Sequence, residues 1–511
     1  MQGTPGNLVP MMTIPTLTTD WVTISPDVGQ GMKAFFNRGI ISTQRVSNYL
    51  GGNPKKARLL KLVADYRVNH ELRDSLSGDM VEALTGFLDK AKDSGRIYAG
   101  LYELGDAELI KKLSSLGKRL SIVLSNSIGQ VDDKPKGTYI NKKGQEVYHQ
   151  KTIDQNLDAR NTVKKKKAEV HDRIFKTGQI GHNKFLVYVD QENVPQAVLL
   201  GSTNWTSSGL CTQTNNTLII EESALAQRYL GYWNLMKEDT EVAAGDSKRL
   251  QAANFREANS ESGTLNIHGA TLHSWFSPNT PKLRGKPGPG EPCPADMAQV
   301  IEYINGAKDA VLFLAFYPGS PSLANWSAAA LNHNKDLFVR GMVTNNSASQ
   351  GFYYDLIDER RTKGSLMSKE DYRVGAADAF VGTKMPKGWE KEILNAGFAI
   401  IHDKIMVIDP FSKDCVVITG SHNLGYRASY NNDENMVIIK GNQKLALAYA
   451  THVLDIYDHF NYRIYFKKYG QSSDGFLKER SEDFLSRHFD AQGNIKSTQL
   501  RFWMQGAERL A

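Results

Sequence analysis

Two short stretches of this sequence combine residue types that can transfer protons and bind anions. The first contains His182 and Lys184, and the second contains His402 and Lys404. Alternate residues of a strand point to the same face, so each histidine should project together with its lysine. Histidine exchanges protons near neutral pH, and lysine supplies positive charge. The two stretches therefore predict one or two sites for acid–base chemistry on an anionic group.

Each stretch is followed by a second short motif, Gly-Ser-x-Asn. Ser202 and Asn204 follow the first stretch, and Ser421 and Asn423 follow the second. Their alternate spacing again places the serine and the asparagine on one face of a strand. Two histidines, two lysines and four hydrogen-bonding side chains match a tetrahedral phosphodiester, whose leaving group needs a proton. The duplicated pattern therefore predicts a phosphodiester-binding site.

No metal-binding pattern accompanies these motifs. The three cysteines, Cys211, Cys293 and Cys415, have neither metal-ligand spacing nor the number needed for a disulfide framework. No cluster of carboxylates lies beside the histidines. We therefore expect no metal and no cofactor, with the lysines neutralising charge where a divalent ion would otherwise do so.

The elements that must position these residues also occur twice. In each half, a helical pattern leads into a strand, a second helix and a second strand before the histidine motif. This order predicts an α/β fold with two tandem lobes. The expected divisions are an N-terminal extension at 1–74, a first lobe at 75–240, a linker at 241–264, a second lobe at 265–468 and a C-terminal extension at 469–511.

The doubled motif resembles the signature of the phospholipase D superfamily, also called the HKD phosphodiesterases. The resemblance covers roughly 75–468, with His-x-Lys, a later aspartate and Gly-Ser-x-Asn present in both halves. It implies two α/β-sandwich lobes related by a pseudo-twofold axis, with one active site at their interface. It also implies a metal-independent reaction in two steps through a covalent phosphohistidine. One chain carrying both motifs would not need to dimerise.

The resemblance also implies roles for individual residues. His182 would be the nucleophile, and His402 would be the general acid that later becomes the base. Glu434 matches a carboxylate that orients the histidine of the opposite lobe, so it would orient His182. The phosphoryl oxygens would be held by Lys184, Lys404, Asn204 and Asn423, with Ser202 and Ser421 supporting the pocket.

The two halves differ in one spacing. Asp409 follows Lys404 by five residues, as the signature requires, whereas Asp190 follows Lys184 by six. A β-bulge within the intervening strand would absorb the extra residue. The resemblance gives this aspartate a role in stabilising the fold, so the difference should not affect the chemistry.

The two halves also differ at the orienting position. Asn215 stands in the first half where Glu434 stands in the second. His402 would therefore lack a carboxylate partner and would hold its proton less tightly than His182. This difference suits a basic nucleophile and a readier acid.

The substrate class remains open between phospholipids and nucleic acids. A long chain with both motifs favours a phospholipase D that hydrolyses, or transfers to an alcohol, the headgroup of a glycerophospholipid; the alternative is a nuclease. The basic run at 161–173, expected in a loop, could bind either a nucleic-acid backbone or anionic lipid headgroups, and it could equally be a solvated surface. The aromatic segment at 350–361 could stack bases, enter a lipid interface or pack in the core.

The expected compartment follows from two patterns that the sequence lacks. It has no apolar stretch long enough to cross a membrane and no secretory signal pattern, so a cytoplasmic protein is expected. A secreted protein whose signal had been removed would look the same. A phospholipid substrate would require peripheral contact with a membrane. A binding protein built on an inactivated copy is a third class, which the intact motifs in both halves disfavour.

Overall fold

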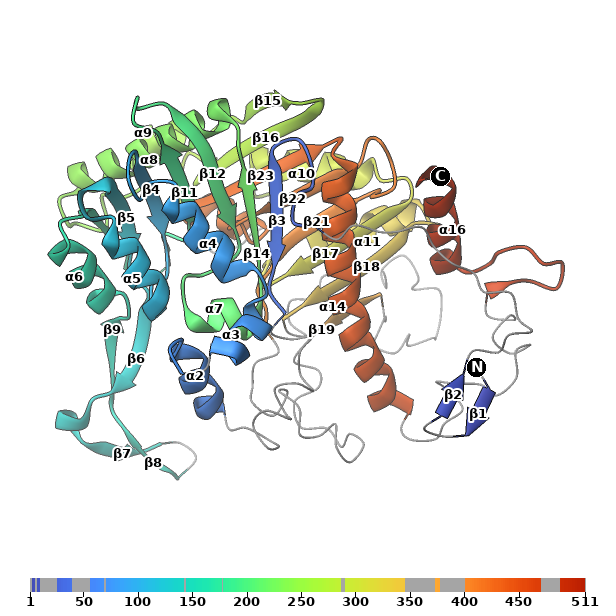
Figure 1. Cartoon of the computed structure of the whole chain (residues 1–511), viewed down its shortest axis with the longest axis horizontal. Helices are drawn as coiled ribbons and strands as arrows, with labels where there is room; N and C mark the ends of the chain where they lie inside the picture. The colour runs from blue at the N-terminus through green and yellow to red at the C-terminus, as the bar shows by residue number, and fades with distance from the viewer. Residues whose placement is uncertain are drawn as a thin grey trace.

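The computed structural model describes most of the chain, and two β-sheets dominate it (Figure 1). The described residues are 2–4, 7–9, 25–38, 56–68, 70–141, 144–176, 178–285, 290–344, 373–376, 400–469 and 488–510. The aromatic segment at 350–361 lies outside the described residues. Among the described helices, none is long and apolar enough to cross a membrane.

The first sheet has seven strands in the order β10-β5-β4-β11-β12-β14-β3. The strands β4, β5 and β10 are parallel, and the remaining neighbours pair antiparallel. Their bounds are β3 Met32–Phe36, β4 Arg96–Leu101, β5 Leu120–Ser125, β10 Glu169–Arg173, β11 Lys184–Val189, β12 Pro195–Gly201 and β14 Asn216–Ile220.

The second sheet has eight strands in the order β15-β16-β23-β22-β21-β17-β18-β19. Read from its other edge, it repeats the first sheet strand for strand and adds β15. The two tandem α/β lobes predicted from the sequence are therefore confirmed. The bounds are β15 Gly263–Ile267, β16 Ala270–Ser277, β17 Ala310–Ala315, β18 Phe338–Val343, β19 Val374–Ala376, β21 Lys404–Ile408, β22 Val416–Gly420 and β23 Glu434–Lys440.

Helices cover both faces of each sheet. Two of them, α8 (Ser223–Ala243) and α14 (Gln443–Tyr469), lie between the sheets and contribute to one hydrophobic core that includes strands of both lobes. The outer faces are covered in the first lobe by α2 Lys56–Ala64, α3 His70–Ser77, α4 Met80–Asp89, α5 Ala107–Ser115, α6 Leu157–Lys165 and α7 Ser207–Cys211, and in the second by α10 Ala295–Asn305, α11 Leu323–His333 and α13 Tyr426–Asn431.

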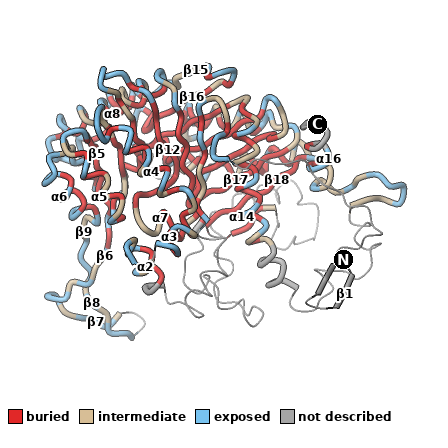
Figure 2. The backbone as a smooth tube through the Cα atoms, viewed as in Figure 1, coloured by how far each residue is buried: buried red, intermediate tan, exposed pale blue. Residues whose placement is uncertain are grey.

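The central strands are buried on both faces, which explains their unbroken apolar sequence. In β21, Ile405 and Val407 face the core shared by the two lobes, whereas Met406 and Ile408 face the outer core of the second lobe. Figure 2 shows this buried layer running through both sheets. The polar ends of these strands are therefore held by rigid, fully packed elements.

The terminal and linking segments contribute to the folded lobes. β3, within the segment 1–74, pairs with β14 and completes the first sheet. Near the other terminus, Phe502 of α16 (Thr498–Leu510) stacks on Phe338 with ring centroids 4.4 Å apart. The segment 241–264 contains α9 (Ala253–Ala258), and two of its polar side chains, Gln251 and Arg256, are buried and donate hydrogen bonds to the second lobe.

The basic run at 161–173 does not lie in a loop, so that prediction was wrong. It forms the end of α6 and the strand β10. Glu169 pairs with Ser121 at the start of β5, whereas the histidine motif lies beside the other end of that sheet. The helix forms because Val163 and Ala159 are buried against the first lobe. The lysines therefore lie at the opposite end of the strands from the histidine motif.

A two-tiered hairpin projects from the first lobe near the bottom left of Figure 1. It is built from four short strands, and it leaves the sheet directly after the end of β5. The bounds are β6 Ile128–Asp132, β7 Thr138–Ile140, β8 Glu146–Tyr148 and β9 Gln150–Asp154.

Candidate active site

The two lobes exchange short backbone contacts that bring the histidine motifs together. The His182 amide donates to the Asp433 carbonyl at 2.9 Å, and the His402 amide donates to the Thr214 carbonyl at 3.2 Å. The second contact is extended by pairing of β13 (Gln213–Thr214) with β20 (Ile400–Ile401). Each histidine therefore lies beside the segment of the opposite lobe that carries its orienting residue.

The imidazole rings of His182 and His402 lie next to each other, with ring centroids 6.5 Å apart and an angle of 69° between their planes. Nδ1 of His182 lies 2.8 Å from Glu434 Oε2, and Nδ1 of His402 lies 2.7 Å from Asn215 Oδ1. Both acceptors favour a proton on Nδ1, which leaves Nε2 of each ring as the reactive nitrogen. The difference inferred from the sequence is therefore present in the structure: His182 contacts a carboxylate, and His402 contacts an amide.

Both lysine side chains are buried at the interface between the lobes, beside the histidine rings. Lys184 and Lys404 each donate from Nζ to the carbonyl of their own histidine. Each ammonium group also lies 5.2 Å from an aromatic ring centroid, that of Tyr102 in the first lobe and Phe316 in the second. The positive charges are thus placed symmetrically about the histidine pair.

Burial changes the protonation of all four groups. It lowers the pKa of Lys184 to about 7, although Glu434 opposes this shift. It lowers the pKa of His182 to about 4, again opposed by Glu434. Burial, together with the charges of Lys404 and Lys184, lowers the pKa of His402 well below its ordinary value, and burial likewise lowers that of Lys404. An anionic ligand would restore the lysine charges by replacing lost solvation.

The Gly-Ser-x-Asn motifs close the site from the neighbouring strands. Ser202 donates to Asn215 at 2.9 Å, and Ser421 donates to Glu434 at 2.7 Å, so each serine fixes the orienting residue. The preceding glycine is required in both copies. A Cβ on Gly201, at φ +149, would lie 2.3 Å from a carbonyl oxygen of the adjacent strand, and Gly420 is equivalent.

The two asparagines differ in their contacts. Asn204 donates to Glu103 Oε2 at 2.6 Å, and Asn423 has no matching carboxylate contact among the described residues. The Oδ1 atoms of Asn204 and Asn423 are buried and accept no hydrogen bond from the described residues. Both amide oxygens are therefore able to accept a hydrogen bond from a ligand.

Sequence analysis missed Glu103. It follows β4, and Lys184 and Lys404 act on its carboxylate while burial raises its pKa. The matching position in the second lobe is Tyr317, so the repeat offered no second copy of this residue. A pattern search based on duplication could not have found it.

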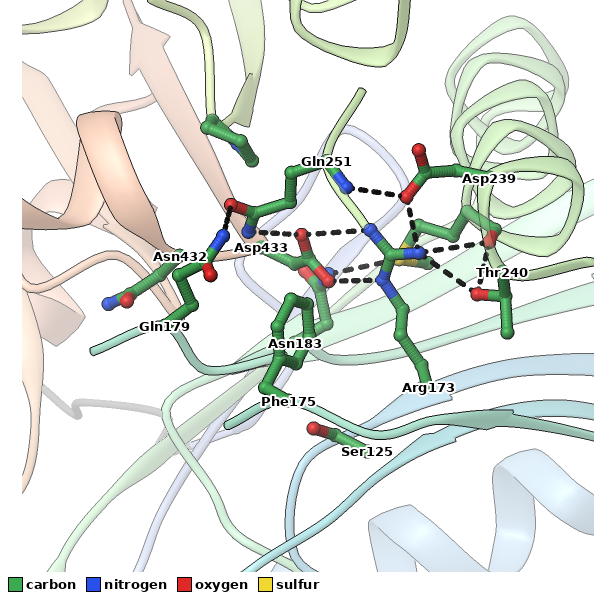
Figure 3. Close-up of polar contacts among 12 residues, drawn as sticks. Ser125, Arg173, Phe175, Gln179, Asn183, Asp239, Thr240, Gln251, Asn432 and Asp433 are labelled. Atoms are coloured by element: carbon green, nitrogen blue, oxygen red, sulfur yellow. Dashed lines mark hydrogen bonds and ion pairs between the residues drawn. The ribbon is translucent and has the colours of Figure 1, made fainter. Parts of the chain in front are cut away.

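A second set of missed residues fixes the segment that carries Glu434 (Figure 3). Arg173 pairs with Asp433 at 2.5 Å and with Asp239 at 2.8 Å, and all three side chains are almost fully buried. Burial would lower the pKa of Arg173, but the two carboxylates raise it above its ordinary value. Gln251 donates to Asp433 at 2.9 Å. This network joins β10, α8 and the second lobe behind the histidines.

The two signature aspartates lie at the far end of their strands. Asp409 accepts three backbone hydrogen bonds, from Lys308, Asp309 and Ala310 at 2.7–2.9 Å. Asp190 instead accepts from Val194 within the β11–β12 turn. The register between β11 and β12 shifts between Tyr188 and Val189, whose partners are Ala197 and Pro195. The unpaired residue is therefore Gln196 of β12, and the prediction of a bulge within β11 was wrong. Both aspartates therefore act on the backbone and do not reach the histidines.

Among the described residues, no group of three or more His, Cys, Asp or Glu side chains is arranged to hold a metal ion. The positive charge at the histidine pair comes from Lys184 and Lys404. The interface between the two lobes therefore carries paired histidines and lysines, side chains that can transfer protons and bind an anion.

Sequence comparison identifies the family. Residues 84–236 and 300–456, more than half of the chain, match the family described as "Cardiolipin synthase, PLD-like domain". The chain therefore belongs to the phospholipase D-like superfamily of phosphodiesterases. A search of curated proteins finds no match.

The solved structures that match this chain are distant from it in sequence. Phosphatidylserine synthase of Haemophilus influenzae Rd KW20 is 12% identical with a TM-score of 0.44, and the alignment covers 74% of this chain and 84% of that one. Yeast tyrosyl-DNA phosphodiesterase is 12% identical with a TM-score of 0.35, covering 70% and 86%. Polyphosphate kinase of Porphyromonas gingivalis is 10% identical with a TM-score of 0.36; the alignment covers 70% of this chain but only 45% of the kinase.

Proposed function

We propose that this protein is a metal-independent phosphodiesterase that works through a covalent phosphohistidine, and that its substrate is a glycerophospholipid. The carrying observation is the pair of neighbouring imidazoles from the two lobes, with ring centroids 6.5 Å apart and a buried lysine beside each. A phosphorus atom between the two Nε2 atoms would have a nucleophile on one side and a proton donor on the other.

In the first step, Nε2 of His182 forms a bond to phosphorus and the bond to the leaving alcohol oxygen breaks. Glu434 holds the Nδ1 proton of His182, so the Nε2 lone pair is free and the developing positive charge is stabilised. His402, protonated on Nε2, gives that proton to the departing oxygen. In the second step, water loses a proton to His402, attacks phosphorus and releases His182.

Lys184, Lys404, Asn204 and Asn423 serve as the groups that stabilise charge on the phosphoryl oxygens. Preorganised donors in a site with little water lower the barrier more than they would in solution. Ser202 and Ser421 keep Asn215 and Glu434 in position through the hydrogen bonds described above. An alcohol in place of water would give transfer instead of hydrolysis.

Two observations support a lipid substrate. The family description refers to cardiolipin synthase, an enzyme named for a lipid. The hairpin that leaves the sheet beside the site exposes Tyr139, Ile140 and Tyr148, with Ile140 65% exposed. Exposed apolar side chains on a projecting element suit peripheral contact with a membrane. The lysines of the basic run, which would have supported a nucleic acid, lie before β10, at the opposite end of the strands from the site.

The test is a side-by-side assay with EDTA present, scoring headgroup release from phospholipid vesicles and cleavage of DNA. We expect headgroup release by the wild type, and its loss by about 10⁴-fold or more in His182→Ala and in His402→Ala, because each removes an essential reacting group. After an acid-free quench, His402→Ala should retain phosphate on His182. Cleavage of DNA alone would move the substrate to nucleic acids, and full activity of either variant would contradict the mechanism.

A further inference from the structure

The outer tier of the projecting hairpin, formed by β7 and β8, is exposed on both faces (Figure 2). All three residues of β7 are exposed, as are two of the three residues of β8. The ring of Tyr139 packs against that of His149, with centroids 4.8 Å apart, and this contact lies within the hairpin itself. A two-stranded ribbon without further packing is only marginally stable in water. A surface that covered the outer tier would therefore stabilise it.

The exposed apolar side chains of the outer tier do not share one face. Thr138 pairs with Tyr148 across the ribbon. Alternate residues of a strand share a face, so Ile140 lies on the same face as Tyr148, and Tyr139 lies on the other. Ile140 is 65% exposed, Tyr139 46% and Tyr148 41%. A flat protein partner would cover one of these faces, whereas a lipid interface surrounds an inserted ribbon and covers both.

The charge of the hairpin suits an anionic lipid surface. Between positions 134 and 151 the sequence has five lysines and a single acidic residue, Glu146. Lys134, Lys136 and Lys151 are exposed, and the Glu146 carboxylate accepts a hydrogen bond from Thr138 at 2.6 Å. Lysines near a membrane are attracted to anionic lipids, and tyrosine combines an apolar ring with a polar tip that suits the level of the headgroups.

The base of the hairpin is fixed beside the active site. Ser127 donates from its hydroxyl to Glu103 at 3.2 Å and from its amide to Asp154 at 3.1 Å. Asp154 ends β9 and pairs with the buried Arg160 at 3.0 Å. Glu103 also accepts a hydrogen bond from Asn204 of the first Gly-Ser-x-Asn motif. A surface bound by the outer tier would therefore be held at the end of the strands where the histidine motif lies.

We infer that the outer tier of the hairpin docks the protein on an anionic lipid surface and so presents that surface to the active site. This inference rests on the proposed function and names the surface on which the reaction takes place. The lysines contact the anionic headgroups, and Ile140 enters the interface together with the two tyrosines. The docked lipids need not be the substrate. A small phosphodiester dissolved in water reaches the histidines without the hairpin.

The first test measures binding without hydrolysis, using the full chain with His182→Ala. Sedimentation is compared for vesicles of phosphatidylcholine alone and mixed with phosphatidylglycerol. Binding should be stronger to the mixed vesicles and should weaken with added salt. Combined Tyr139→Ser and Ile140→Ser should weaken it by about tenfold or more, because less apolar surface enters the interface. Combined Lys134→Gln, Lys136→Gln and Lys151→Gln should remove the preference for the mixed vesicles.

Both sets of variants have matched controls at the opposite end of the strands. Lys165, Lys166 and Lys167 are exposed at the end of α6, and changing all three to glutamine removes the same charge. Val194→Ser removes an exposed apolar side chain from the turn between β11 and β12. Neither control should change binding. An equal loss of binding in the two lysine triples would assign the attraction to the charge of the whole protein and overturn the role of the hairpin.

The second test follows catalysis in chains that keep His182. Headgroup release from the mixed vesicles, scored for both choline and glycerol, should fall by about tenfold in the outer-tier variants. Hydrolysis of bis(p-nitrophenyl) phosphate, which is soluble and needs no docking, should stay at the wild-type rate in the same variants. Unchanged headgroup release in these variants would overturn the inference.

The outcomes separate this inference from the proposed function. Hairpin-dependent binding to double-stranded DNA, with no binding to the mixed vesicles, would assign the outer tier to nucleic acid and overturn the inference. Vesicle binding that depends on the hairpin, without any His182-dependent hydrolysis of phospholipid or of bis(p-nitrophenyl) phosphate, would overturn the proposed function and leave the docking surface in place.

Discussion

At the scale of single residues, one difference between the lobes separates the two histidines. His182 contacts a carboxylate, Glu434, and His402 contacts an amide, Asn215, at nearly the same distance. A carboxylate stabilises an imidazolium that an amide cannot stabilise. The nucleophile therefore has support for the positive charge that it gains, whereas the acid gives up its proton readily.

The lowered pKa values predict the pH dependence of kcat/KM. Below the pKa of His182, about 4, the nucleophile becomes protonated and activity falls. As the pH rises, His402 loses the proton that it must donate, because its pKa lies well below its ordinary value, and Lys184 loses its charge at a pKa of about 7, so activity falls again. Bis(p-nitrophenyl) phosphate suits this measurement because the substrate does not ionise over that range. A high-pH limb near the ordinary lysine pKa of about 10.4 would show that Lys184 is not desolvated.

Glu434→Gln extends this test. Glu434 raises the pKa of both His182 and Lys184, so its neutral isostere should move both limbs to lower pH. The variant should also lower kcat by roughly 10²- to 10⁴-fold, the range of assistance to acid–base groups. If kcat fell but both limbs of the pH profile stayed in place, Glu434 would only hold the His182 ring in position.

At the scale of elements, the same signature aspartate stabilises different backbone in the two lobes. Asp409 joins the end of β21 to the start of β17 through three amides, and it adopts φ +49. Asp190 closes only the turn between β11 and β12. The extra residue of the first lobe therefore changes which backbone the aspartate reaches.

This difference predicts unequal effects on stability. Asp409→Ala leaves buried amides unpaired and strains a left-handed residue, so it should lower the free energy of unfolding by about 2–4 kcal/mol. Asp190→Ala should cost about 1 kcal/mol, as for an exposed turn. Asp409→Asn, which tolerates the same φ, is the control. Thermal unfolding checks the order, and equal effects of the two alanine variants would contradict it.

At the scale of the whole molecule, the lobes share one core and one buried ion network. α8 and α14 pack between the sheets, and Arg173 of the first lobe pairs with Asp433 of the second. Because the Asp433 carbonyl also accepts from the His182 amide, the same residue joins the lobes and positions the nucleophile. A substitution in this network should therefore change both the free energy of unfolding and the catalytic activity.

Arg173→Met should lower the free energy of unfolding by about 3–5 kcal/mol, because it leaves Asp433 and Asp239 buried without a partner. Arg173→Met combined with Asp433→Asn should recover part of this loss. Arg96→Met, which removes a half-exposed pair with Glu169, should change stability by about 1 kcal/mol or less. Calorimetry measures all three, and additive losses in the double variant would contradict the coupling.

The sequence by itself determined the duplication, the α/β class and the residues that repeat. The histidines, lysines, serines and asparagines of the repeated motifs could be found from the sequence. Their spacing follows the periodicity of a strand and occurs twice, so no tertiary information is needed to recognise them. The extra residue before Asp190 predicted an irregularity in this hairpin, but the spacing placed it in β11 and the structure has it in β12. These features are local in the chain, so their spacing is sufficient evidence.

Only the tertiary structure decided what lies opposite these residues. Arg173 and Asp433 are 260 residues apart, and Glu103 has no copy in the second half, so neither spacing nor repetition could reveal them. The basic run also looked like a loop until the burial of Val163 showed a helix. Long-range packing sets such contacts, because the lobes must first fold and meet before these side chains become neighbours.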